Sequence, residues 1–268
     1  MHVYTKWMRD LFSWLLSSIW AMLPPILIVL AVLWWIRKKV SIEALRKHHD
    51  VVGYTFSIVG VLYSVILGFT VVNVQEHYNK AEETVRTEAT MIADLYRDAS
   101  YFDDLSCMTI RTNLRVYLQY VLNEEWALPY DQIRRERADT ILQNLWRSYE
   151  GIDLGSEKTK IWYGQMISKL DRLMDARLAR EFSSWEHLSS MMWAILIVGA
   201  FVVVCFMFFF GLENFRVQVL ITVFLTGYLT FILYLVYSLD YAFHGPMKIT
   251  TQSLEETQIV LDRLDQQT

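Results

Sequence analysis

Glycine and proline are scarce in this sequence, with 10 and 4 among 268 residues, and neither occurs between Gly68 and Pro129. Both residues interrupt helices, so their scarcity favours long, unbroken helical segments. No stretch shows the period-two alternation of apolar and polar residues that is typical of strands. The sequence therefore predicts an all-α protein.

Cysteine is rarer still, and its two positions exclude a stabilising disulfide. Cys107 lies in a charged segment and Cys205 lies in the middle of an apolar run, so the two side chains are expected in different media. No CxxC pair or Cys/His cluster has the spacing of a zinc site. We expect both thiols to be packing residues and expect no metal and no cofactor.

Charged residues are absent from the interior of four long apolar runs. Each run reaches the ~20 residues that a helix needs to cross about 30 Å of hydrocarbon, and a charge inside such a run would be costly in lipid. The chain is therefore predicted to be an integral, multi-pass membrane protein with four transmembrane helices in two hairpins. The predicted spans are Leu11–Ile36, Val51–Val74, Met191–Leu212 and Val217–Leu239.

Catalytic and nucleotide-binding motifs are also missing. The sequence contains no GxSxG, no Walker loop, no GxGxxG and no HExxH. The formal net charge is −4, and no arginine-rich groove or basic tail suggests a nucleic-acid partner. The protein is therefore expected not to be an enzyme and not to bind nucleic acid, and its expected surroundings are the lipid bilayer.

The remaining segments predict a helical extramembrane bundle inserted between spans 2 and 3. Span 2 is expected to continue into this bundle, Asp103 or Asp104 is expected to cap its next helix, and a helix beginning at Ser156 is expected to run on into span 3. Pro24-Pro25 should kink or break span 1. The predicted segments are 1–75 for the first hairpin, 76–188 for the extramembrane bundle, 189–240 for the second hairpin, and 241–268 for a tail with a short helix.

Span 2 carries a stripe of small residues spaced three or four apart. This spacing places them on one face of a helix, where small side chains allow close packing between membrane helices. The same face could instead line or support a pore in an oligomer. The helix-packing residues are Gly53, Ser57, Gly60, Ser64 and Gly68.

Bulky apolar residues form further rows along span 2, either Val61, Val65 and Phe69 or Ile58, Leu62 and Ile66. A ring of such side chains around an axis could gate ions by excluding water. We expect the narrowest, driest stretch near Leu62, Ile66 and Phe69, and a polar girdle at Asn73 and Gln75 that affects selectivity. A solvated membrane interface is the alternative interpretation of that girdle.

A set of short matches identifies a resemblance that extends from the linker between spans 1 and 2 to the tail. The chain resembles a bacterial family of unknown function described as bestrophin-like and, more distantly, the bestrophin anion channels. The matching segments are 60–69, Val72-Asn73, His77-Tyr78, Ala81-Glu82, Glu88-Ala89, 95–97, Glu125-Trp126 and 239–245.

This resemblance implies a homo-oligomeric channel for small inorganic ions such as chloride, pentameric by analogy, with its pore lined by span 2. It also implies a location in the bacterial inner membrane, with the insert in the cytoplasm. The five Lys or Arg residues of the linker between spans 1 and 2 favour the opposite orientation, and the basic residues at the N-terminus and on the flanks of the insert balance them, so charge counting leaves the orientation open. The acidic calcium clasp of animal bestrophins has no counterpart after Gly245, so calcium gating is not implied. The alternative function is a non-conducting membrane sensor or scaffold whose helical domain binds a partner protein.

Overall fold

The computed structural model describes residues 2–40, 43, 49–126 and 135–266, and this part of the chain is helical and contains no strand. Four of its helices are long and apolar enough to cross a membrane, and each contains one of the predicted spans. The prediction of an all-α, four-span membrane protein is confirmed. The chain divides into two compact units, each built from segments distant in sequence.

The membrane unit comprises Met1–Tyr78 and His187–Lys248. In this unit, buried residues of three spans form one apolar core, which includes Tyr63, Leu196 and Val236. Most of the remaining apolar surface of the spans is exposed, as expected for helices that face lipid or other subunits. The membrane helices are α1 (His2–Lys39), α3 (His49–Asp98), α7 (Ser190–Phe209) and α8 (Phe215–Asp240).

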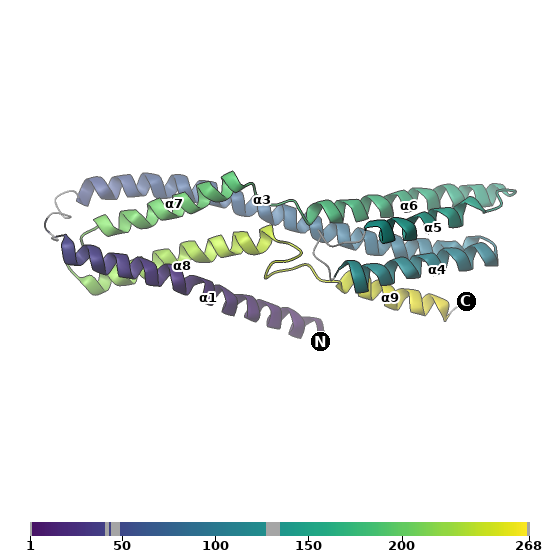
Figure 1. The fold of residues 1–268 in the computed structure, drawn as a ribbon, viewed down its shortest axis with the longest axis horizontal. Coiled ribbons are helices and arrows are strands. Elements are labelled where there is room, and N and C mark those ends of the chain that lie inside the picture. The colour runs from purple at the N-terminus through teal and green to yellow at the C-terminus, as the bar shows by residue number, and fades with distance from the viewer. Residues whose placement is uncertain (1, 41–42, 44–48, 127–134, 267–268) are drawn as a thin grey trace. The chain divides into compact units, whose positions relative to one another are not determined.

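Helix α1 packs against α8 (Figure 1), and polar and aromatic side chains pair between the two helices. The indole Nε1 of Trp14 donates to Ser238 Oγ at 2.9 Å, and the Tyr234 hydroxyl donates to Ser17 Oγ at 2.8 Å. These bonds satisfy polar groups that lipid could not satisfy. Helix α1 runs without interruption through Pro24-Pro25, so of the two predicted outcomes, a kink or a break, the break does not occur.

The second unit, which we call the extramembrane unit, comprises Asn79–Glu186 and Ile249–Thr268. Helix α3 contributes its C-terminal part to this unit, which confirms that span 2 continues beyond the membrane segment. Fully buried side chains on four of its helices include Ile92, Leu114, Leu145 and Leu170. Its other helices are α4 (Asp104–Tyr120), α5 (Arg135–Glu150), α6 (Glu157–Ser183) and α9 (Gln252–Asp265).

Side chains cap two of these helices as the sequence predicts. Asp103 accepts a hydrogen bond from the backbone N–H of Ser106 at 3.0 Å and begins α4. Ser156 accepts from the backbone N–H of Lys158 at 3.2 Å and begins α6. A five-residue π-helix, Val121–Glu125, follows α4 directly.

The final helix, α9, is anchored on the extramembrane unit by carboxylates near its C-terminal end. Arg115 forms ion pairs with Asp262 at 2.7 Å and with Asp265 at 2.6 Å. The Tyr96 hydroxyl also donates to Asp265, and Leu261 of α9 is fully buried. The chain after span 4 therefore ends on α3 and α4 rather than as an unattached tail.

The helix expected to run from Ser156 into span 3 does not do so. Helix α6 ends at Ser183, and α7 begins only at Ser190, with Ser189 as its N-cap. The carboxylate of Asp240 accepts hydrogen bonds from the Leu188 backbone N–H at 2.7 Å and from Trp193 Nε1 at 3.1 Å. These contacts stabilise a non-helical entry to span 3, and the partner that makes them lies about 50 residues away in sequence.

Candidate functional site

Helix α3 packs against other helices of the chain with one face, and its opposite face is exposed. Tyr63, Leu67 and Val74 are buried in the membrane unit's core. Residues two apart on an α-helix point roughly 200° apart, so the valines two positions earlier point away from that core. These residues, Val61, Val65 and Val72, have exposed fractions of 62%, 49% and 56%.

The predicted gate residues Leu62, Ile66 and Phe69 recur at i, i+4 and i+7, which places them on one face of α3. Leu62, Ile66 and Phe69 are all exposed, with Phe69 the most exposed at 74%. Phe69 also continues the Val61–Val65 row, since it lies four residues beyond Val65. Asn73 and Gln75 are both exposed but are two residues apart, so they point to nearly opposite sides of the helix.

The predicted small-residue stripe lies on open surface within one chain. A side-chain carbon placed on Gly53, Gly60 or Gly68 would meet no atom within 4 Å. Ser57 and Ser64 are exposed and donate only to carbonyls of their own helix. Among the described residues, the stripe therefore packs against no other helix of the chain, and its helix-packing role stays a prediction.

A close helix contact that the sequence reasoning missed occurs at Gly199 of α7. A side-chain carbon at this position would lie 2.3 Å from Tyr63 Cδ2. The Tyr63 hydroxyl donates to the Leu196 carbonyl at 3.0 Å, which holds the ring across α7. Gly199 is a single glycine in an apolar run, so no repeat in the sequence signals the contact.

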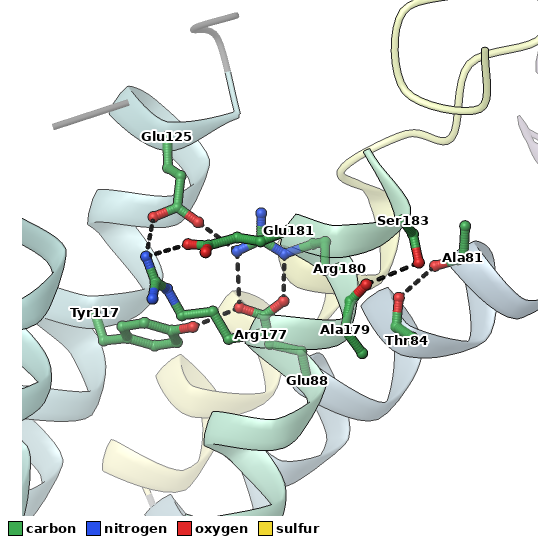
Figure 2. Close-up of polar contacts among 10 residues, drawn as sticks. All are labelled: Ala81, Thr84, Glu88, Tyr117, Glu125, Arg177, Ala179, Arg180, Glu181 and Ser183. Atoms are coloured by element: carbon green, nitrogen blue, oxygen red, sulfur yellow. Dashed lines mark hydrogen bonds and ion pairs between the residues drawn. The ribbon is translucent and has the colours of Figure 1, made fainter. Parts of the chain in front are cut away.

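The extramembrane unit contains a cluster of buried charges, which we call the ion cluster: Glu88, Glu125, Arg177 and Arg180 (Figure 2). Arg180 binds both carboxylates, with Nε at 2.6 Å from Glu88 Oε2 and Nη2 at 2.5 Å from Glu125 Oε1. Arg177 pairs with Glu125 at 3.1 Å. The four side chains come from α3, the π-helix and α6, so the cluster ties these elements together.

Neighbouring groups complete the hydrogen bonding of the ion cluster. The Tyr117 hydroxyl donates to Glu88 Oε1 at 2.5 Å, and Arg177 forms a further ion pair with Glu181 at 2.7 Å (Figure 2). Glu88 and Glu125 expose 0% and 2% of their surface. Burial without partners would be very costly for such carboxylates, so the two arginines are required for this arrangement.

The electrostatics of the ion cluster keep Glu125 ionised. Burial alone would raise its pKa, but the charges of Arg180 and Arg177 and their hydrogen bonds outweigh burial and lower the pKa below its ordinary value of 4.5. Burial raises the pKa of Tyr117, and the negative charge of Glu88 raises it further. Tyr117 is therefore a neutral hydrogen-bond donor.

The lowered pKa of Glu125 predicts a pH-dependent contribution to stability. Because the carboxyl binds its proton less readily in the folded state, its contribution is complete above its unfolded-state pKa and is lost as pH falls through the folded-state value. Glu125→Gln should therefore lower the thermal unfolding temperature at about pH 7 far more than at a pH below the folded-state pKa of this carboxyl. A difference between variant and wild type that does not change with pH would contradict this result.

Sequence reasoning treated Glu88 and Glu125 as parts of local patterns and did not bring them together. Arg177 and Arg180 lie three residues apart on α6, and no local sequence pattern marks them as buried. Their convergence depends on tertiary packing. Within the described residues, no group of three or more His, Cys, Asp or Glu side chains is placed to hold a metal.

These observations define a class: a four-span membrane protein whose second span has an open apolar face and continues into a helical extramembrane unit. A family model for the Bestrophin-like domain matches residues 24–254. The chain therefore belongs to the Bestrophin-like family. No curated protein matches the sequence.

Solved structures show the same fold. A variant of a bacterial bestrophin homologue from Klebsiella pneumoniae is similar with a TM-score of 0.69 and 16% identity, over 93% of this chain and 99% of that one. The structure of this homologue phased with zinc has a TM-score of 0.67 and 16% identity, over 92% and 97% of the two chains. A crystal structure described only as a membrane protein gives 0.69 and 16%, over 92% and 97%. At 16% identity, these similarities show a shared fold and nothing more specific.

Proposed function

We propose that the protein is an oligomeric ion channel of the bacterial inner membrane, with a pore lined by α3. The observation that carries the proposal is the uncharged, exposed face of α3 opposite its buried face. In a symmetric ring, a helix that packs outward on its own subunit presents the opposite face to the axis. Family membership supports a channel rather than an enzyme.

In the proposed pore, the narrowest stretch is formed by Val61, Val65 and Phe69. This row lies opposite the core, whereas Leu62 and Ile66 lie toward its flank and would face a neighbouring subunit or the pore margin. Rings of valine and phenylalanine exclude water, so an ion faces a desolvation barrier there. Thr70, the residue after Phe69, is buried, so Asn73 is the first exposed polar position beyond the constriction, and Gln75 points elsewhere.

The proposed assembly is a closed homo-oligomer, a pentamer by analogy with bestrophins. The open stripe that contains Gly60 and Gly68 offers a surface for close approach of a helix from another subunit. Chloride is the proposed ion, because no acidic residue occurs on α3 between Val61 and Asn73. An acidic residue there would repel an anion at close range.

Shortening the proposed constriction should increase conduction. The double variant Val65→Ala with Phe69→Ala should widen and wet the ring and raise chloride flux from proteoliposomes severalfold, because the dewetted barrier is removed. Single-channel recordings in planar bilayers measure the same change as a larger conductance or a higher open fraction. The matched variant Leu62→Ala with Ile66→Ala should have the smaller effect.

Phe224→Ala, an equally exposed phenylalanine on α8, serves as a control for loss of an aromatic ring on the spans. A larger effect of the Leu62 and Ile66 variant would place that row on the axis instead. If wild type and both double variants are silent while folded and fully assembled, the channel proposal fails. The sensor or scaffold function would then replace it.

A further inference from the structure

The end of the membrane unit where α1 stops is fastened to the turn between α7 and α8 (Figure 1). Arg37 Nε donates to Gln218 Oε1 at 2.8 Å, and its Nη2 donates to the carbonyl of Leu212. The guanidinium also lies 5.6 Å from the centre of the Phe215 ring. The Arg37 guanidinium is therefore held by contacts within the membrane unit.

The next two residues, Lys38 and Lys39, carry positive charges that make different contacts. The Lys38 ammonium lies 5.3 Å from the ring centre of Trp34, and the Lys39 ammonium lies 4.6 Å from that of Trp35. Both lysines are exposed, and no carboxylate of the described residues pairs with either one. Each lysine instead rests against an indole one helical turn earlier, an arrangement stabilised by cation–π attraction.

The two tryptophans indicate the depth at which these lysines lie. Trp34 and Trp35 are 59% and 54% exposed and belong to the last turns of the apolar segment Phe12–Lys39. Tryptophan at the end of a span sits at the boundary between acyl chains and headgroups. A lysine held on its ring therefore presents its ammonium at headgroup level.

The charge of this end is positive. Residues 37–50 contain five lysine or arginine residues and two acidic residues, and the exposed Arg216 lies on the first turn of α8 at the same end. Such juxtamembrane basic groups attract anionic lipid headgroups. We propose that this end of the membrane unit binds acidic phospholipid headgroups through Lys38 and Lys39, with Trp34 and Trp35 setting their depth.

The geometry suits lipid rather than free phosphate. A phosphate ion in water needs several donors converging in one cavity, whereas Lys38 and Lys39 lie side by side on an exposed helix end. Two ammonium groups presented in this way can each meet a separate headgroup in a continuous layer. The inference requires only that the membrane unit lies in a bilayer, so it does not depend on ion conduction.

Native mass spectrometry of the whole protein, with phosphatidylglycerol or phosphatidylcholine added in detergent, tests the proposal. Wild type should retain phosphatidylglycerol in preference to phosphatidylcholine. Lys38→Gln with Lys39→Gln should reduce that preference about tenfold or more, as expected for the loss of two interfacial charges. Trp34→Leu with Trp35→Leu, which keeps both lysines, should reduce it less.

The matched control is Lys80→Gln with Lys158→Gln, which removes the same charge from two exposed positions of the extramembrane unit and should leave the preference unchanged. An equal loss in this control would show a general charge effect and overturn the proposal. Equal retention of both lipids by wild type would also overturn it. So would retention of added inorganic phosphate that depends on Lys38 and Lys39.

Discussion

Replacing Arg180 by methionine should lower the opening free energy of the extramembrane unit by about 3–5 kcal/mol, because it leaves buried charge without its partner. Glu88 would keep only the Tyr117 hydroxyl, while Glu125 would keep Arg177. Hydrogen-exchange mass spectrometry of the whole protein measures this change in peptides from α3, the π-helix and α6. All three should exchange faster together, since the ion cluster joins them.

Arg86→Met is the matched control for this substitution. Arg86 also pairs with a glutamate, Glu82, but both side chains are exposed and the two residues lie one turn apart on the same helix. Exposed pairs of this kind contribute about 0.3–0.5 kcal/mol, so exchange should hardly change. If the two variants behaved alike, the ion cluster would not hold the unit together.

Gly199→Val should disrupt the packing of α3 on α7 in the membrane unit. The added carbon would meet the Tyr63 ring at 2.3 Å, so one of the two helices must move. Overpacking of this kind costs about 1–3 kcal/mol or more. A lower thermal unfolding temperature in detergent would measure the effect, and adding Tyr63→Ala should restore part of the loss by making room.

Gly60→Leu gives the complementary control for Gly199→Val. This glycine faces open space in one chain, so leucine should leave the subunit's thermal stability nearly unchanged. By holding neighbouring helices apart it should reduce the subunit number seen in native mass spectrometry. Reduced stability with intact assembly would show that the stripe packs within the subunit instead.

The membrane architecture could be predicted because it depends on local composition. The uncharged runs, the absence of Gly and Pro between Gly68 and Pro129, and the caps at Asp103 and Ser156 are each readable within a few residues. These features determine where helices begin and how far they extend. The division of the chain into four segments and the roles of the α3 rows remain predictions.

The missed features depend on contacts between residues distant in sequence. The break before α7 is stabilised by Asp240, and the Gly199 contact needs Tyr63, more than 130 residues earlier. Likewise, Arg180 meets Glu88 across 92 residues. Helical periodicity reports which side of a helix is apolar, but it does not report which distant side chain will lie against it.

The π-helix at Val121–Glu125 has a consequence for comparing relatives of this chain. A π-turn accommodates one residue more than a regular α-helical turn. Losing a residue from this stretch would restore ordinary α-helical geometry and still direct a glutamate toward Arg177 and Arg180. Losing a residue within α4 would instead rotate Leu114 and Tyr117 against the rest of the helix. In an alignment of relatives, a one-residue gap within Val121–Glu125 is therefore structurally neutral, whereas a gap one turn earlier, within α4, is disruptive.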